Sequence, residues 1–129
     1  MINKTIHFVI GGMIILLGAG CHYDKADLVY PSDGNCDTSH VISYSKEIVP
    51  IFSENCYHCH GGDAANGAGI MLDQYDWVYT MAVDLGQLVP AIKHEPGVVP
   101  MPQDIYPQKI PDCDISKIEA WVNQGAPNN

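Results

Sequence analysis

A cluster of cysteine and histidine residues near the middle of the chain carries the clearest chemical signal. Cys56, Tyr57, His58, Cys59 and His60 form the pattern CxxCH. This is the attachment motif of c-type haem, in which two thiols add to the porphyrin vinyl groups and the adjacent histidine binds the iron. With 5 cysteines and 6 histidines in 129 residues, chance alone gives the pattern in about one such chain in a hundred. The motif therefore predicts one covalent haem c, held by Cys56, Cys59 and His60.

Two other kinds of site could use the same residues. A zinc site could combine Cys56 and Cys59 with a pair of histidines, but His40 and His94 stand alone in the sequence and offer no second close pair of ligands. A thioredoxin-like redox pair needs a strand before the motif and a βαβ surround, and neither is visible. Haem attachment is the better interpretation.

An iron bound to His60 has a second axial face. The candidate ligands for it are Met71, Met81, Met101 and His94. Met71 follows His60 by only 11 residues, a short span to cross the macrocycle, and Met81 fits a buried helical face. Met101 lies in Val99–Pro102, where flanking prolines preclude helix and hold the backbone extended. We therefore predict His60 and Met101 as the iron ligands; the alternative is a loop methionine that covers apolar surface.

The element that must deliver Cys56 to a haem is a helix before the motif. Ser43 or Ser45 can cap it, and Glu47 suits its positive N-terminal end. One face is formed by Ile48, Ile51, Phe52 and Asn55.

A second helix is predicted near the C-terminus. Asp114 can cap it, and Ser116 with Glu119 resembles a capping box. Its apolar stripe comprises Ile115, Ile118, Trp121 and Val122 and ends before Gly125. We expect Trp121 to pack in the core against Phe52 of the first helix.

The segment between these helices is predicted to be irregular, with short helical pieces. Gly61–Gly69 is a loop of small residues, and helices are expected over about Tyr75–Met81 and Leu85–His94.

The N-terminus resembles a bacterial lipoprotein signal. One lysine precedes the apolar run Ile6–Gly20, which is shorter than the roughly 20 residues of a spanning helix. The run ends in Leu17–Cys21, similar to a lipobox, with Gly18 as a departure from the pattern. We predict a signal peptide over 1–20, lipid on Cys21, a linker over 21–39 and one domain over 40–129; simple secretion with a free Cys21 is the alternative.

Charge narrows the classes of partner. The chain has 15 acidic residues against 6 lysines, has no arginine, and carries a formal net charge of −9. Nucleic-acid binding needs clustered cations, so it is disfavoured, and a partner attracted by charge would itself be basic.

The chain resembles the small monohaem class I cytochromes c, and more narrowly bacterial lipoprotein cytochromes of this type. The pattern that carries the resemblance runs through Cys36, Tyr44, Ile48, Pro50, Cys56, His60, Gly69, Leu72, Tyr75, Met101, Cys113, Ile115, Ile118, Trp121 and Gly125. The resemblance implies an all-α, haem-wrapping domain with its N- and C-terminal helices packed together and long irregular loops. The resemblance also implies a proline shortly after the motif, whose carbonyl orients the proximal histidine. This chain departs from that pattern, because no proline follows the motif until Pro90. Another carbonyl, within Gly67–Leu72, would have to accept from His60.

The cysteine count predicts a disulfide. Five cysteines, less one for lipid and two for haem, leave Cys36 and Cys113 in an oxidising compartment. The alternative is a pair of free buried thiols.

Together these features predict an electron carrier rather than an enzyme. It would be lipid-anchored in the bacterial cell envelope, on the periplasmic or cell-surface side, with redox proteins as partners. The alternatives are a haem enzyme or a gas or peroxide sensor with an open iron, and a domain without haem that is held by metal or disulfides.

Overall fold

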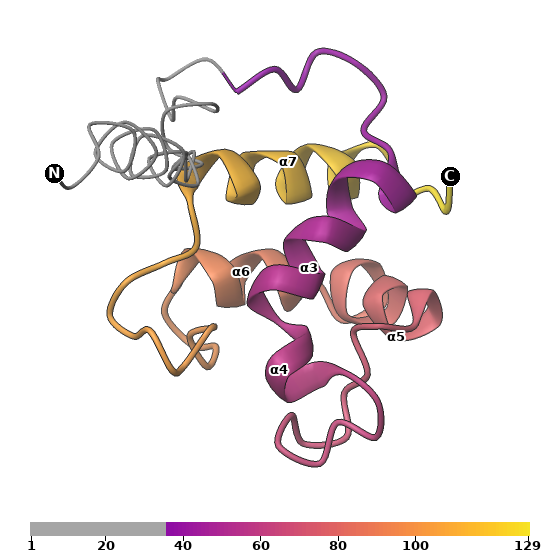
Figure 1. Ribbon diagram of the computed structural model, residues 1–129. Coiled ribbons are helices and arrows are strands. Elements are labelled where there is room, and N and C mark those ends of the chain that lie inside the picture. Colours follow the sequence, from indigo (N-terminus) through magenta and orange to yellow (C-terminus); the bar gives the residue numbers. More distant parts are fainter. Residues whose placement is uncertain (1–35) are drawn as a thin grey trace, which may run out of the picture. The chain divides into compact units, whose positions relative to one another are not determined.

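The computed structural model describes residues 36–129 (Figure 1). The predicted signal peptide over 1–20, the acylation site Cys21 and all but the last residues of the predicted linker lie outside this range. Within 36–129 every regular element is a helix and no strand is present, so the all-α class is confirmed. No helix in this range is long and apolar enough to span a bilayer.

The helix before the motif begins after Ser43, one of the two predicted caps. Its first turn is η2 (Tyr44–Ile48), followed by α3 (Val49–Asn55). The Ser43 hydroxyl accepts from the Lys46 amide at 3.4 Å, and the Glu47 carboxylate accepts from the Ser43 amide at 3.0 Å. These reciprocal bonds satisfy donors that the helix itself leaves free.

The widened first turn is explained by Pro50. The Ser43 carbonyl accepts from both the Glu47 amide at 3.0 Å and the Ile48 amide at 3.3 Å, the second of which is a π-helical bond. Pro50 has no N–H, and its ring crowds the carbonyl four residues earlier, so the turn before it opens. The backbone then continues through Cys56 into the short helix α4 (Tyr57–His60), which carries the end of the CxxCH motif.

The middle of the chain forms short helices near the predicted ones. Helix α5 (Tyr75–Tyr79) runs directly into the π-helical turn η3 (Thr80–Asp84), so this piece is longer than predicted. It ends before Gly86, whose φ of +62° is costly for a residue with a side chain. Helix α6 (Leu88–Lys93) begins later than expected and ends where His94 turns left-handed.

The last helix, α7 (Asp112–Asn123), contradicts the predicted capping. It begins directly after Pro111, so Asp114 lies inside the first turn instead of capping it. Ser116 does not form a capping box; its hydroxyl donates to the Asp112 carbonyl at 2.9 Å. Pro111 instead occupies the N-cap position with φ of −50° and ψ of 139°, and its carbonyl accepts from the Ile115 amide at 3.1 Å. The predicted end is correct, because Gly125 has a φ of +90°.

The first and last helices pack together as predicted, through η2 and α7, and α7 also contacts α6. Trp121 and Phe52 are both fully buried. However, the ring that stacks on Trp121 is Tyr44, with centroids 5.4 Å apart, rather than Phe52. The Trp121 indole donates to the Pro127 carbonyl at 3.0 Å, which ties the C-terminal segment to this core.

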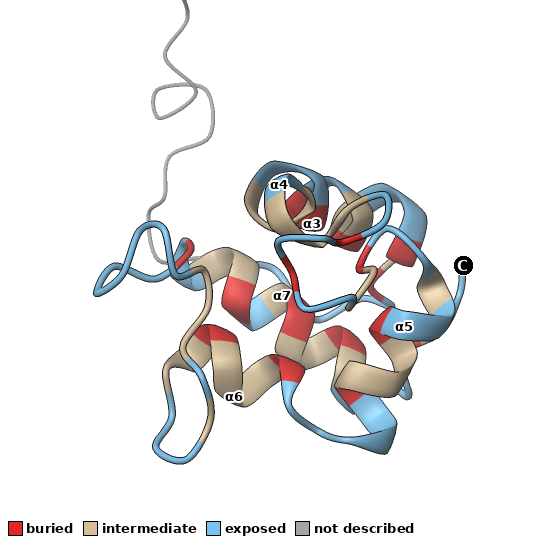
Figure 2. Cartoon of the chain, turned by 90° about the horizontal axis from the view of Figure 1, so that it is seen from below, coloured by how far each residue is buried: buried red, intermediate tan, exposed pale blue. Residues whose placement is uncertain are grey.

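The predicted cysteine partners meet at the start of α7. The Cys36 and Cys113 Sγ atoms lie 2.07 Å apart, at disulfide distance, and the Cα atoms are 5.3 Å apart. The pair therefore joins the first described residue to the last helix. The segments that connect the helices are mostly exposed, as Figure 2 shows for the loop between α6 and α7.

Candidate functional site

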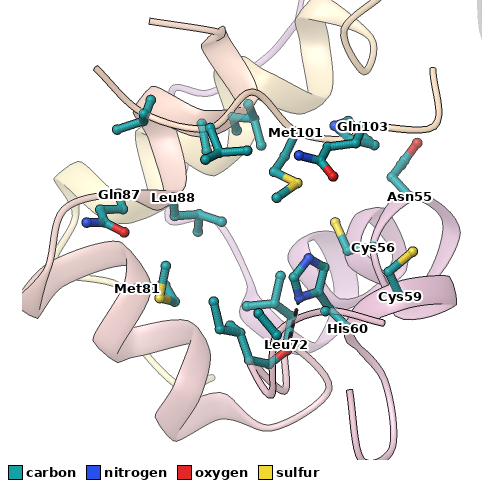
Figure 3. Close-up of a pocket in the computed structure, with 18 of the residues that line it drawn as sticks. Asn55, Cys56, Cys59, His60, Leu72, Met81, Gln87, Leu88, Met101 and Gln103 are labelled. Atoms are coloured by element: carbon teal, nitrogen blue, oxygen red, sulfur yellow. Dashed lines mark hydrogen bonds between the residues drawn. The ribbon is translucent and has the colours of Figure 1, made fainter. Parts of the chain in front are cut away.

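A pocket of about 550 Å³ lies between the CxxCH segment and the loop that follows α6 (Figure 3). Its volume falls in the range of 300–1,000 Å³ that is typical of sites for small molecules and cofactors. Two walls face each other across it. We call residues 56–72 the His60 wall and residues 88–104 the Met101 wall. The apolar lining comes from Ile70, Leu72, Leu88, Ala91, Ile92, Val98, Val99 and Ile110.

The His60 imidazole is fixed by a hydrogen bond to its own wall. Its Nδ1 lies 3.0 Å from the carbonyl oxygen of Ile70. A carbonyl oxygen can only accept, so Nδ1 carries the proton and Nε2 keeps a free lone pair. The Leu72 amide donates to the His60 carbonyl at 2.8 Å, which closes the segment between them. The orienting carbonyl thus lies within the predicted segment Gly67–Leu72, at Ile70.

Gly67 is a site residue that the sequence analysis treated only as part of a flexible loop. It is buried, and a Cβ placed on it would lie 2.5 Å from the His60 Nδ1 and 2.5 Å from the Cys59 carbonyl oxygen. No side chain fits there, so the glycine is required by close packing against the imidazole. A cluster of glycines after the motif is the only sequence signal for it, and that signal does not single out this position.

Cys56 and Cys59 are half-buried, line the pocket and are not bonded to each other. Burial, with a smaller contribution from the charge of Asp104, raises the pKa of the Cys56 thiol to about 12. A thiol–disulfide exchange pair needs a lowered thiol pKa. The environment of Cys56 therefore disfavours the thioredoxin-like alternative.

Of the four sulfur and nitrogen candidates for a second ligand, only Met81 and Met101 line the pocket. Figure 3 shows Met101 reaching in from the wall opposite His60, with Met81 farther along the cavity. Met71 does not line the pocket, and its sulfur accepts from the side-chain amide Nε2 of Gln74 at 3.2 Å. His94 does not line it either, and its Nε2 lies 3.0 Å from the Met101 carbonyl oxygen.

Charged groups are scarce at the pocket. Asp104 is the acidic residue in its lining, and neither Lys93 nor Lys109 contributes to it. Lys93 instead pairs with Glu119 of α7 at 3.0 Å. Within residues 36–129, no group of three or more His, Cys, Asp or Glu side chains is placed to hold a metal ion.

Comparison with protein-family models, with curated proteins and with solved structures finds no match for this chain.

Proposed function

We propose that this protein is a one-electron carrier with a single covalently bound haem c. The observation that carries the proposal is the arrangement around one largely apolar pocket. Cys56, Cys59 and His60 line it on one side, and Met101 enters from the opposite wall (Figure 3). Two thiols, one imidazole and one thioether are the groups by which c-type haems are held.

The fit of the cofactor is supported by the surroundings of His60. Close packing against Gly67 and the hydrogen bond from Nδ1 to the Ile70 carbonyl fix the orientation of the imidazole ring. With the proton on Nδ1, the lone pair of Nε2 is free for iron. In this proposal Cys56 and Cys59 would form the thioethers, and His60 and Met101 would bind the iron. The haem supplies the one-electron couple, and a thioether ligand raises its reduction potential. A largely apolar lining would also favour the reduced state, whereas the acidic net charge of the chain would favour the more positive ferric state.

Partners follow from charge. The formal net charge of −9 makes redox proteins with basic docking surfaces the favoured partners. The protein would attach to a membrane through the lipid proposed on Cys21. This lipid would anchor it on the periplasmic or cell-surface side of a bacterial envelope. Mass spectrometry of the mature N-terminus tests this anchor; an N-terminus other than acylated Cys21 contradicts it.

The decisive experiment is expression in bacteria that carry a c-type haem maturation system. Haem staining after denaturing electrophoresis should reveal a band for the wild-type chain, and its reduced spectrum should be low-spin. The double variant Cys56→Ala with Cys59→Ala should lose the stain entirely, because both thioethers are gone.

The chain offers a matched control in its other cysteine pair. The double variant Cys36→Ser with Cys113→Ser removes the same number of cysteines and should keep the stained band. A wild-type protein without covalent haem would contradict the proposal. It would favour the alternative of a domain without haem that is held by metal or disulfides. A high-spin ferrous spectrum that changes on adding carbon monoxide would instead indicate an open iron, as in a haem enzyme or a sensor.

A further inference from the structure

The backbone of Met101 is held at both of its polar groups by the end of α6. Its amide donates to the Ala91 carbonyl at 3.0 Å. Its carbonyl oxygen lies 3.0 Å from Nε2 of His94. Because a carbonyl oxygen only accepts, His94 donates through Nε2–H. These two contacts connect the methionine directly to the helix that forms part of the pocket wall.

The position of His94 explains how its ring reaches the loop. Its backbone is left-handed, with φ of 55° and ψ of 43°, and it terminates α6. The ring also lies against Tyr106, with centroids 5.6 Å apart. A residue in the left-handed region carries a conformational cost, so its side-chain contacts must compensate. One residue before it, Lys93 pairs with Glu119 and ties this end of α6 to α7.

The loop that carries Met101 needs such support. It has no helix or strand between α6 and α7, and its second half is mostly exposed. The flanking prolines restrict its local shape, but they do not fix where the loop sits relative to the pocket. The bonds to Ala91 and His94 supply that placement.

From this geometry we propose that His94 is a positioning residue that holds the Met101 sulfur toward the pocket. The inference rests on the proposed haem function, in which that sulfur binds iron opposite His60. His94 acts on ligation through the Met101 carbonyl and does not touch the iron. Removing the donor should shift the equilibrium between bound and released Met101 sulfur by about tenfold toward release, the effect expected for one hydrogen bond.

The test uses the haem-loaded protein and three replacements at one position. His94→Phe keeps a ring beside Tyr106 but removes the donor. His94→Asn tolerates the left-handed backbone but is too short to reach, so it covers the case in which the phenylalanine variant fails to fold. His94→Gln places an amide N–H where Nε2 was and should rescue the wild-type behaviour.

Two measurements follow ligation without depending on electron transfer. The first is the weak far-red band of sulfur bound to ferric haem. The second is cyanide affinity, which rises as the sulfur leaves the iron. The phenylalanine and asparagine variants should weaken the band and bind cyanide about tenfold more tightly, and the glutamine variant should match the wild type.

A control separates the hydrogen bond from ring packing. Tyr106→Leu removes the aromatic contact and keeps the donor, so it should retain the band. A band and cyanide affinity unchanged in both His94→Phe and His94→Asn would overturn the inference, as would a loss in Tyr106→Leu as large as in His94→Phe. Absence of covalent haem in the wild type defeats the proposed function itself and is recognised before any variant is compared.

Discussion

The two walls of the pocket are built in different ways. The His60 wall is a helix end and a closely packed turn, in which Gly67 leaves no space for even one added carbon beside the imidazole. The Met101 wall pairs a short helix with an irregular loop, attached to it by the hydrogen bonds of Ala91 and His94. A closely packed region has no space for added atoms. A loop, by contrast, can move when one of its hydrogen bonds is lost.

The His60 wall is therefore the fixed wall, and the Met101 wall is the adjustable one. The imidazoles of His58 and His60 both line the pocket from the fixed wall, and that of His60 is held by the Ile70 carbonyl. Two sulfurs, those of Met81 and Met101, reach the cavity from elsewhere. We expect changes on the His60 wall to lower the stability of the whole protein. Changes on the Met101 wall should alter ligation while the fold persists.

The largest effect is expected for Met101→Ala. If Met101 binds iron, the far-red band of the ferric protein should disappear, and cyanide or carbon monoxide should bind readily. Met81→Ala is the matched control, because it removes a thioether that lines the same pocket. A band that survives in Met101→Ala and vanishes in Met81→Ala would show that Met81, rather than Met101, binds the iron.

The next largest effect is expected for removal of the Cys36–Cys113 pair by the two serine substitutions. Loss of a link across 77 residues should lower the free energy of unfolding by up to about 4 kcal/mol in the chain-entropy account. Helix α7 packs against α6, which anchors Met101. The far-red band should therefore be lost at a lower denaturant concentration than the one at which the main haem absorption changes. Simultaneous loss of both signals would mean that the two walls melt as one unit.

Gly67→Ala tests the fixed wall. The added Cβ would lie 2.5 Å from Nδ1 of His60, and overpacking of this kind costs about 1–3 kcal/mol. Thermal unfolding should show the loss, and the visible spectrum should shift as the imidazole is displaced. In Gly69→Ala, where a Cβ meets nothing within 4 Å, only the cost of a φ of +76° remains, so the spectrum should not change. A spectrum equally altered in both variants would contradict close packing as the cause.

The smallest effect is expected in η2, away from both walls. The Ser43 amide, with smaller contributions from His40 and Lys117, holds the pKa of Glu47 below its usual value. Because the pKa of Glu47 is lower in the folded state, its carboxylate contributes stability at pH values above its unfolded pKa, near 4.5. This contribution is lost as the pH falls through the folded-state pKa. Glu47→Gln should therefore cost under about 1 kcal/mol at pH 7 and less than that at pH 3. Thermal melts at both pH values measure this, and a larger difference at pH 3 would reverse the sign.

Local patterns in the sequence were enough to predict several elements. The Ser43 cap, the apolar faces of the first and last helices and the stop at Gly125 depend on neighbours within a few residues, and the structure agrees with all of them. The start of α7 was predicted incorrectly because two local signals competed there. Pro111 and Asp114 each suit a helix start, and only the packed structure shows that Pro111 prevails.

The CxxCH motif can be recognised from the sequence alone, because its three functional groups lie within five consecutive residues. Tertiary folding set the contacts between residues that lie farther apart in the chain. It placed the Ile70 carbonyl on His60, packed Gly67 against the ring, stacked Tyr44 on Trp121 and fastened Met101 to α6. Backbone carbonyls and missing side chains leave no mark in a residue pattern, so contacts of this kind emerge only when the chain is folded.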